Sequence, residues 1–186
     1  MRRTIDILIS FFLLILLALP MLILIIVIKL ESSGPALFWS ERVGVNNISF
    51  KMPKFRTMID GTAAVATHLL SNPSSHLTRI GDLLRKTSID ELPQLLSILR
   101  GHMTFVGPRP ALFNQTDLIE LRTKNKVDSL VPGVTGWAQV NGRDKISIRE
   151  KVNFDIEYLH KRSIKLDLYI IFFTLLKVFK KEGISH

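Results

Sequence analysis

An uncharged, apolar run at residues 7–28 constrains the fold of this chain more than any other feature. As a straight helix rising about 1.5 Å per residue, the run would reach about 33 Å, close to the thickness of a bilayer core. A cleaved signal peptide fits less well, because the run is long and no small-residue cleavage site ends it. We therefore expect residues 1–31 to form a membrane element.

Two features complicate a simple membrane span. Pro20 lies inside the run, where a proline removes a backbone hydrogen bond and favours a kink. Arg2 and Arg3 precede the run and Lys29 follows it, and basic flanks favour the cytoplasmic side at both ends. The residues leave two forms open: a straight span, and a re-entrant helix that bends at Pro20 and leaves by the face it entered.

Residues 84–110 hold the side chains best suited to chemistry. Asp90 and Glu91 are adjacent carboxylates, with Arg85 before them and Arg109 after them. A helix N-terminus beside cations attracts phosphate, whereas two carboxylates repel phosphate unless they bind a metal ion or react with it. The alternative is an ordinary helix cap whose acidic first turn is solvated.

An apolar stripe predicts a helix directly after this acidic pair, and Gly101 predicts its end. The stripe consists of Leu92, Leu95, Leu96 and Leu99. Its start is open between two positions. Ser88 and Glu91 fit a capping box, whereas Pro93 favours a later start near Asp90, because a proline is tolerated among the first, unpaired N–H groups.

Two later segments are candidates for ligand contacts. Arg109 stands between two prolines, which stiffen the backbone around a guanidinium able to grip phosphate with two hydrogen bonds; an ordinary turn with an exposed arginine is the alternative. Residues 131–143 form a predicted glycine-rich loop in which Gln139, Asn141 and Arg143 can read hydroxyls, amides or phosphates. The spacing of this loop matches no known nucleotide signature.

The remaining segments predict short strands and helices. Residues 36–40 suit a strand or the membrane interface, and a turn at residues 42–47 leads to a strand at residues 48–51. Helical patterns cover residues 78–86, 112–126 and 148–161. Residues 166–179 are apolar with lysines at their end, which fits either an interfacial helix on an anionic membrane or a docked C-terminal core helix.

The charge balance predicts a polyanionic partner. Lysine and arginine number 25 against 16 acidic residues, for a formal charge of +9, which suits nucleic acid, an anionic membrane or phosphorylated substrates. The cations around Phe55 are weak support for nucleic acid, since a solvated basic edge gives the same pattern. The chain has no cysteine, which excludes disulfides, thiolate metal sites and cysteine nucleophiles.

Taken together and in order, the motifs of the chain resemble those of the monotopic bacterial phosphoglycosyl transferases, the polyprenyl-phosphate sugar transferases that begin glycan assembly. The resemblance covers nearly the whole chain and is closest to the short, catalytic-unit-only form. The motifs are Arg3-x-x-Asp6, Ser33-Gly34-Pro35, Arg42-x-Gly44, Lys54-Phe55-Arg56-Thr57-Met58, the segment LRKTSIDELPQL at residues 84–95, Gly107-Pro108-Arg109-Pro110, Pro132-Gly133-Val134-Thr135-Gly136 and Gln139-Val140-Asn141-Gly142-Arg143.

The resemblance implies a mostly α fold with short β segments (α+β). Residues 1–31 would form a re-entrant membrane helix broken at Pro20. Residues 32–186 would form a catalytic domain on the cytoplasmic face of the bacterial inner membrane, with interfacial amphipathic helices that include the C-terminal one. The protein would then be monotopic.

The resemblance also implies a reaction: a sugar 1-phosphate passes from a UDP-sugar to undecaprenyl phosphate, with release of UMP. Asp90 would be the nucleophile that forms a covalent phosphosugar intermediate, and Asp90 and Glu91 would hold Mg²⁺, with Mn²⁺ as a substitute. We assign Arg56, Arg85 and Arg109 to substrate phosphate, and Gln139, Asn141 and Arg143 to the nucleotide-sugar.

The implied partners are the UDP-sugar, undecaprenyl phosphate, the anionic inner leaflet of the bilayer and downstream glycosyltransferases, but not nucleic acid. The product would start O-antigen, capsule, exopolysaccharide or glycoprotein glycans, and the short form favours an N-acetylated amino sugar. The chain departs from the family pattern at Leu19, His102 and Val131, where serine, aspartate and arginine are frequent. Two rival interpretations are an inactive scaffold of the same fold and a membrane-tethered nucleic-acid binder.

Overall fold

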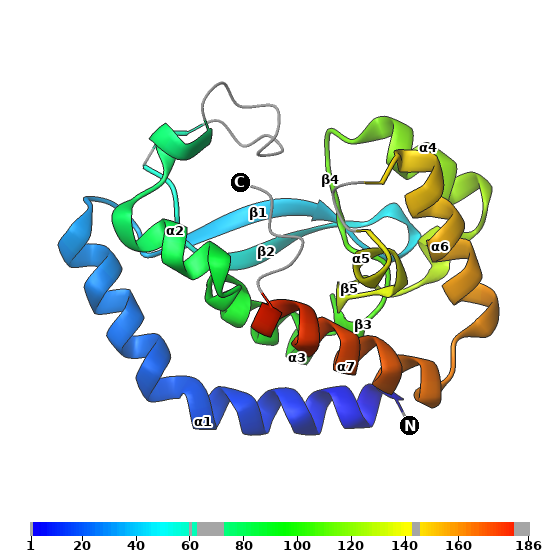
Figure 1. Ribbon diagram of the computed structural model, residues 1–186, viewed down its shortest axis with the longest axis horizontal. Coiled ribbons are helices and arrows are strands. Elements are labelled where there is room, and N and C mark those ends of the chain that lie inside the picture. The colour runs from blue at the N-terminus through cyan, green and yellow to red at the C-terminus, as the bar shows by residue number, and fades with distance from the viewer. Residues whose placement is uncertain (1, 60, 63–72, 143–145, 181–186) are drawn as a thin grey trace.

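The computed structural model of the protein describes residues 2–59, 61–62, 73–142 and 146–180. It shows a mostly helical α+β fold with short strands, as predicted, and a long helix that runs beneath the domain (Figure 1). The helices are α1 (Arg2–Glu31), α2 (Arg79–Lys86), α3 (Leu95–Arg100), α4 (Thr116–Lys124), α5 (Trp137–Val140), α6 (Ile148–Lys161) and α7 (Ile164–Lys180). The strands are β1 (Leu37–Val43), β2 (Ser49–Phe55), β3 (Thr104–Val106), β4 (Ala111–Leu112) and β5 (Gly133–Thr135). Single 3₁₀ turns are η1 (Val45–Asn47), η3 (Pro73–His76), η4 (Ile89–Gln94) and η5 (Val127–Ser129).

Helix α1 remains one helix through Pro20 and bends partway along its length (Figure 1). A core helix of this composition would be mostly buried, but only 6 % of its most apolar window is buried. Its N-terminal half packs on α3, and its C-terminal half buries Ile28 against Phe55 and Leu84. Both halves of α1 therefore rest on the same domain, while its outer side exposes apolar residues. The most exposed of these include Leu8, Phe12, Ile15, Leu19 and Leu30.

Polar contacts fix the N-terminal end of α1 to the domain. Arg3 donates from Nη1 to Ile98 O and from Nη2 to Leu99 O, the latter at 2.8 Å. These carbonyls belong to the last turn of α3, where a helix leaves acceptors without partners. Asp6 is 8 % exposed and accepts a hydrogen bond of 2.7 Å from Thr104 Oγ1. The first turns of α1 are thus tied to α3 and β3.

The strands form two small sheets. The β1–β2 hairpin pairs from Leu37↔Phe55 to Val43↔Ser49, and β4 adds to the free edge of β1. The turn predicted at residues 42–47 is confirmed in its later part as η1, whereas Arg42 and Val43 still belong to β1. In η1, Asn46 (φ 52°) adopts the left-handed conformation that asparagine tolerates. The second strand is longer than the four residues predicted. A parallel pair, β3–β5, forms the other sheet.

The predicted loop at residues 131–143 is wrong in part, because it contains strand β5 and the short helix α5. Parallel pairing with β3 could not be read locally, since the two strands are far apart in sequence. The pairing needs glycine: a Cβ on Gly133 would lie 2.1 Å from Gly107 N. Only a residue without a side chain allows the two backbones to approach this closely.

The capping box predicted at Ser88 is also wrong. Ser88 has a left-handed backbone (φ 56°), and its side chain makes no capping hydrogen bond. The chain passes through the 3₁₀ turn η4 before α3 begins at Leu95, later than either predicted start. In the folded chain η4 packs against β2, a long-range contact that these local signals do not report. The predicted end is confirmed: Gly101 caps α3 with φ 87°.

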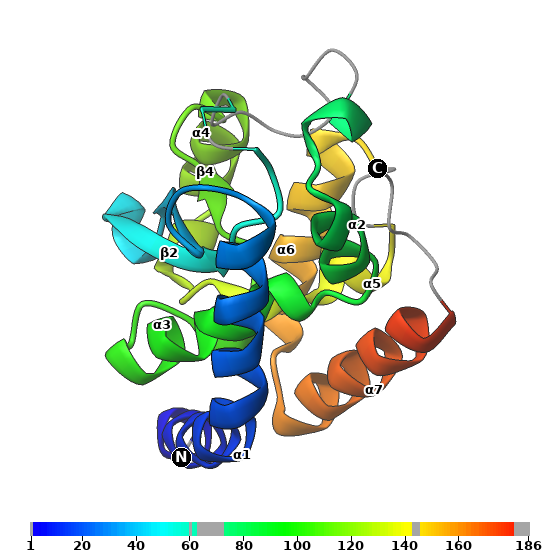
Figure 2. The same cartoon turned by 90° about the vertical axis from the view of Figure 1, so that its left-hand side faces the viewer.

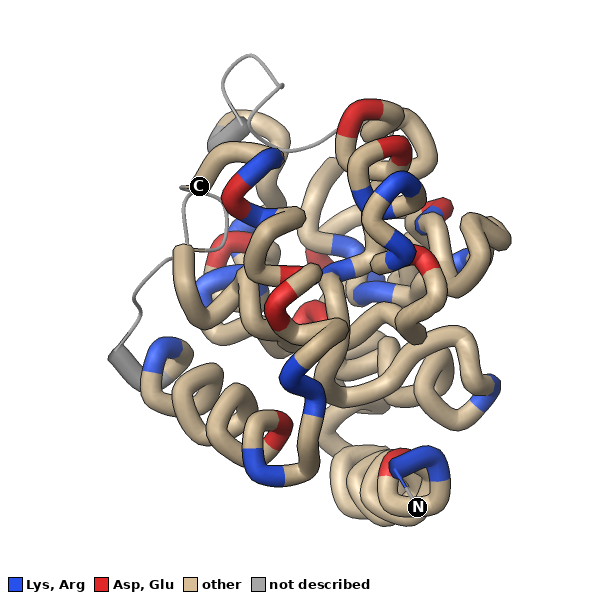
Figure 3. The backbone as a smooth tube through the Cα atoms, turned by 90° about the vertical axis from the view of Figure 1, so that its right-hand side faces the viewer, with Lys and Arg blue, Asp and Glu red and all other residues tan. Residues whose placement is uncertain are grey.

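Helix α7 combines the two alternatives considered for the C-terminal segment. One side is docked: Ile170 is fully buried against a cluster that includes Val106 and Tyr158. The other side exposes apolar residues, among them Leu168 (62 %) and Phe172 (57 %). Figure 2 shows α1 and α7 along the same lower edge of the domain, and Figure 3 shows a middle part of α7 without charged residues. Arg2 and Asp167 join the two helices through an ion pair of 3.2 Å.

Candidate active site

The acidic pair lies in η4, which packs against strand β2. This packing brings Lys54, the next-to-last residue of β2, to the pair. Lys54 Nζ lies 2.7 Å from Glu91 Oε1 and 3.9 Å from Asp90 Oδ2. Asp90 itself is only 7 % exposed. A buried carboxylate pair is costly unless cations compensate it, and β2 provides the first of them.

Arg109 provides a second cation. Its Nη2 lies 2.8 Å from Glu91 Oε1, so this oxygen is shared by Arg109 and Lys54. Arg85, on the last turn of α2, donates from Nε to Thr57 Oγ1 at 2.9 Å. Burial raises the pKa of Asp90, and the charge of Arg85 offsets a part of this rise. Two of the three arginines assigned to phosphate therefore surround the acidic pair.

The two carboxylates differ in pKa because their partners differ. Burial favours a higher pKa for Glu91, but the charges of Arg109 and Lys54, with a hydrogen bond from each, hold that pKa well below its usual range. Burial raises the pKa of Asp90, and the charge of Lys54 opposes this effect without cancelling it. The surroundings therefore favour the ionised form more strongly at Glu91 than at Asp90.

Arg56 is not placed beside the acidic pair. Its Nη2 donates to Ser32 O (2.8 Å) and to Ser32 Oγ (2.7 Å), which ties the end of β2 to the end of α1. The side chain is 5 % exposed, and within the described part of the chain its Nε and Nη1 have no partner. Its assignment to substrate phosphate stays a prediction, in a position apart from Asp90 and Glu91.

The residues assigned to the nucleotide-sugar make local contacts. Gln139 Nε2 donates to Val134 O at 3.0 Å, and Asn141 Nδ2 donates to Trp137 O at 2.8 Å. Both amide nitrogens thus stabilise the β5–α5 turn, although Asn141 is exposed. Arg143 lies outside the described residues. These three assignments stay predictions.

Two site residues were missed in the sequence. The first is Lys54, which stands in the basic cluster at residues 54–58. In a longer strand, Lys54 and Arg56 would lie on the same face, but β2 ends at Phe55, so their side chains need not point the same way. Arg42 donates from Nη1 to Pro110 O at 3.1 Å. Burial, followed by the charge of Arg109, lowers the pKa of Arg42 to about 10. Arg42 could be found only from the pairing of β1 with β4, which brings it beside the Arg109 loop.

The donor set at the acidic pair fits Mg²⁺. No group of three or more His, Asp or Glu side chains gathers within the described ranges, so the protein provides no complete cage for a metal ion there. Mg²⁺ is commonly held by one or two carboxylates together with substrate phosphate oxygens and water. Lys54 Nζ lies 3.9 Å from Asp90 Oδ2, beyond hydrogen-bond distance, and both Lys54 and Arg109 contact Glu91 at Oε1. The Asp90 and Glu91 carboxylates are therefore the side chains that would hold the ion.

The fold and the site define an α+β protein with an exposed apolar N-terminal helix and a buried acidic pair among cations. A model of the family described as bacterial sugar transferase matches residues 1–181. The chain belongs to this family.

Similar proteins extend this result. The chain is 39 % identical over 187 residues to the uncharacterized sugar transferase EpsL of Bacillus subtilis (strain 168), across 100 % of this chain and 90 % of EpsL. It is 37 % identical to the UDP-glucose:undecaprenyl-phosphate glucose-1-phosphate transferase of Escherichia coli (strain K12), across 98 % of this chain and 41 % of that protein. It is 35 % identical to the UDP-N-acetylgalactosamine-undecaprenyl-phosphate N-acetylgalactosaminephosphotransferase of Aeromonas hydrophila, across 83 % and 38 %.

Proposed function

We propose that the protein transfers a sugar 1-phosphate from a UDP-sugar to undecaprenyl phosphate and releases UMP. The observation that carries the proposal is the buried pair of Asp90 and Glu91 among Lys54, Arg85 and Arg109. The names of the Escherichia coli and Aeromonas hydrophila relatives support undecaprenyl phosphate as the acceptor and a UDP-sugar as the donor. Such a product is a substrate for glycosyltransferases that extend the glycan.

The proposed reaction has two displacements at one phosphorus atom. The Asp90 carboxylate attacks the phosphorus that carries the sugar, and the bond from this phosphorus to the bridging oxygen breaks, so that UMP leaves with that oxygen. A phosphate oxygen of undecaprenyl phosphate then attacks the same phosphorus and displaces Asp90. Each displacement is easier than a direct transfer between two anions.

The surrounding side chains would assist these steps without reacting. Arg109 and Lys54 hold Glu91 ionised and reduce the repulsion between the site and the diphosphate, and Arg85 contributes positive charge near Asp90. Mg²⁺, bound by Asp90 and Glu91 together with substrate oxygens, would supply charge stabilisation of the leaving UMP.

We propose further that α1 enters and leaves the bilayer by the cytoplasmic face, so that the protein is monotopic. Three observations support this: Pro20 lies at mid-helix, α1 bends, and both of its ends contact the same domain. A straight span would have to pull one end away from the domain. The donor nucleotide-sugars are made in the cytoplasm, which places the domain there.

The experiment that tests the function measures UMP release by the purified protein with undecaprenyl phosphate and a panel of UDP-sugars. The relatives' names include glucose and N-acetylgalactosamine, so the panel spans both simple hexoses and N-acetylated amino sugars. We expect release with at least one donor, with an N-acetylated amino sugar as the first candidate. A protein that binds these ligands but never releases UMP would be an inactive scaffold instead.

A further inference from the structure

A buried ion pair lies outside the reacting centre, between α4 and α6. Arg122 donates from Nε (2.9 Å) and from Nη2 (2.7 Å) to the same oxygen, Asp155 Oδ2. Arg122 is 8 % exposed and Asp155 is 1 % exposed. Replacing a buried ion pair with apolar side chains of similar volume is often neutral or stabilising, so stability alone gives a weak reason for this pair. The remaining donor of Arg122, Nη1, indicates a role other than stability.

Arg122 Nη1 donates to the backbone carbonyl oxygen of Arg109 at 2.8 Å. Arg109 lies between Pro108 and Pro110, which have no N–H and cannot contribute donors to a turn. The carbonyls of this loop are therefore held from outside: Pro108 O accepts from Gly133 N at 2.9 Å, and Pro110 O accepts from Arg42. Arg122 provides the corresponding contact at Arg109 itself.

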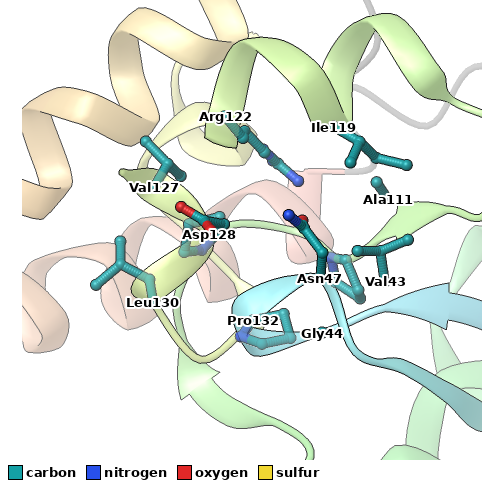
Figure 4. A pocket seen from close by; sticks show the side chains of 12 residues that line it. Val43, Gly44, Asn47, Ala111, Ile119, Arg122, Val127, Asp128, Leu130 and Pro132 are labelled. Carbon is teal, nitrogen blue, oxygen red and sulfur yellow. The ribbon is translucent and has the colours of Figure 1, made fainter. Parts of the chain in front are cut away.

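A small cavity lies beside the two prolines that flank Arg109. The cavity measures about 30 Å³, room for little more than one water molecule. Pro108 and Pro110 line one part of it and Arg122 another. Figure 4 shows the Arg122 side chain pointing from α4 toward this space.

We propose that Arg122, held by Asp155, is a positioning residue that fixes the Arg109 backbone so that the Arg109 guanidinium faces Glu91 and the substrate phosphate. The chain of contacts runs from Asp155 through Arg122 to Arg109 O, and from Arg109 Nη2 to Glu91 Oε1 at 2.8 Å. The inference rests on the proposed function, because Arg109 is assigned there to substrate phosphate.

A double-mutant cycle between Arg122 and Arg109 tests the inference. Arg122→Lys keeps a cation beside Asp155, but one ammonium group lacks the fork that reaches Asp155 and Arg109 O together. We expect kcat/KM for UMP release to fall about tenfold, with most of the loss in KM, as for loss of a uniform binding contact. In the Arg109→Ala background, the same substitution should change kcat/KM less than twofold. Equal losses in both backgrounds, or wild-type kinetics for Arg122→Lys, would overturn the proposal.

A second variant separates positioning from folding. Arg122→Met combined with Asp155→Leu removes both charges and leaves no unpaired ion in the interior. We expect a melting temperature close to wild type but the same loss of kcat/KM as in Arg122→Lys. Full activity in this double variant would contradict the positioning role. Lys124→Gln, which removes one exposed charge from the same helix, is the matched control and should leave kcat/KM unchanged.

A binding measurement keeps the test independent of the reaction. If the wild-type protein releases no UMP from any donor, the same double-mutant cycle can be measured as affinity for UMP, by calorimetric titration in the presence of Mg²⁺. Coupling between Arg122 and Arg109 in UMP affinity would support the positioning role even if the proposed function fails. Additive effects on UMP affinity would overturn it.

Discussion

The acidic site and the face formed by α1 and α7, called the lower face below, depart from the usual distribution of side chains in opposite ways. Soluble domains bury apolar groups and expose charges. Around Asp90 and Glu91, charged groups are buried, whereas α1 and α7 expose leucines and phenylalanines. Buried charges and exposed apolar side chains both cost free energy in water, so each region indicates contact with something other than water. The buried charges fit the phosphate-bearing substrate of the proposed function, and the exposed apolar faces suit a lipid surface.

The comparison also shows how differently the two regions are built. The lower face consists of two helices, each continuous in sequence. The acidic site is assembled from β1, β2, α2, η4 and the Arg109 loop, which tertiary packing brings together. Loss of one side chain should therefore disable the site but only weaken the lower face.

The largest expected effect is at Asp90. Asp90→Asn keeps the shape of the side chain but removes the nucleophile, so we expect UMP release to fall by at least about 1000-fold. Covalent labelling by a UDP-sugar that carries a radiolabel in the sugar should disappear as well. Asp117→Asn, at an exposed position on α4, is the matched control. Retained labelling in Asp90→Asn would move the nucleophile to another residue.

Removal of the metal ion should have a similar but reversible effect. An excess of chelator should stop UMP release, and Mg²⁺ should restore it, because the Asp90 and Glu91 carboxylates repel the diphosphate unless a metal cation lies between them. Mn²⁺ should restore it in part. Glu91→Gln should raise the Mg²⁺ concentration needed for half-maximal rate. Full activity in excess chelator would refute the metal requirement.

A smaller loss is expected at Arg109. Arg109→Lys keeps the charge but loses the planar fork, so kcat/KM should fall about tenfold to 100-fold. Arg109→Ala should lose at least as much, because Glu91 then loses one of the two cations that contact its Oε1. Steady-state kinetics of UMP release measure both variants. If Arg109→Ala has wild-type kinetics, Arg109 is a structural turn residue only.

The lower face can be tested through the path of α1. Thr4 and Ser49 are exposed, and cysteines placed singly at these positions would be the only thiols of the chain. An impermeant thiol reagent should reach neither cysteine in sealed cells and both once the inner membrane is opened. With Pro20→Ala, the reagent should label the cysteine at position 4 in only a fraction of the molecules in sealed cells. The fraction stays small because Arg3 and Asp6 still hold the start of α1 to the domain.

Labelling of the Thr4 cysteine alone in sealed cells, with Pro20 intact, would show that α1 spans the membrane. Labelling of both cysteines in sealed cells would place the domain outside and contradict the cytoplasmic location.

The smallest effect is expected on α7. Phe172→Ser and Leu168→Ser remove exposed apolar side chains from its outer face, and each should reduce binding to anionic vesicles only a few-fold, because α1 remains as the main anchor. Flotation of the protein with vesicles measures this binding. Ile48→Ser is the control, since Ile48 is 66 % exposed but lies in the hairpin turn. An equal loss in all three variants would argue against a specific lipid-facing side of α7.

Much of the fold could be predicted because its signals are local. Helix α6 was predicted at its full extent, residues 148–161, since its apolar periodicity lies within the segment itself. The end of α3 at Gly101 is another local signal. The start of α3 was not predictable to the residue, because Ser88, Asp90 and Pro93 favour different starts, and the packing of η4 on β2 is a long-range contact.

The sequence by itself determined the apolar helix, the proline within it, the acidic pair and the arginine between two prolines. These are properties of residues that are adjacent in the sequence, and such residues lie close together in any fold. Only the tertiary structure decided that Lys54 and Arg109 share one oxygen of Glu91, that Arg56 lies at the end of α1, and that Arg122 holds the Arg109 backbone. The physical reason is that each of these contacts joins segments whose proximity depends on how the helices and strands pack, which no short stretch of the chain encodes.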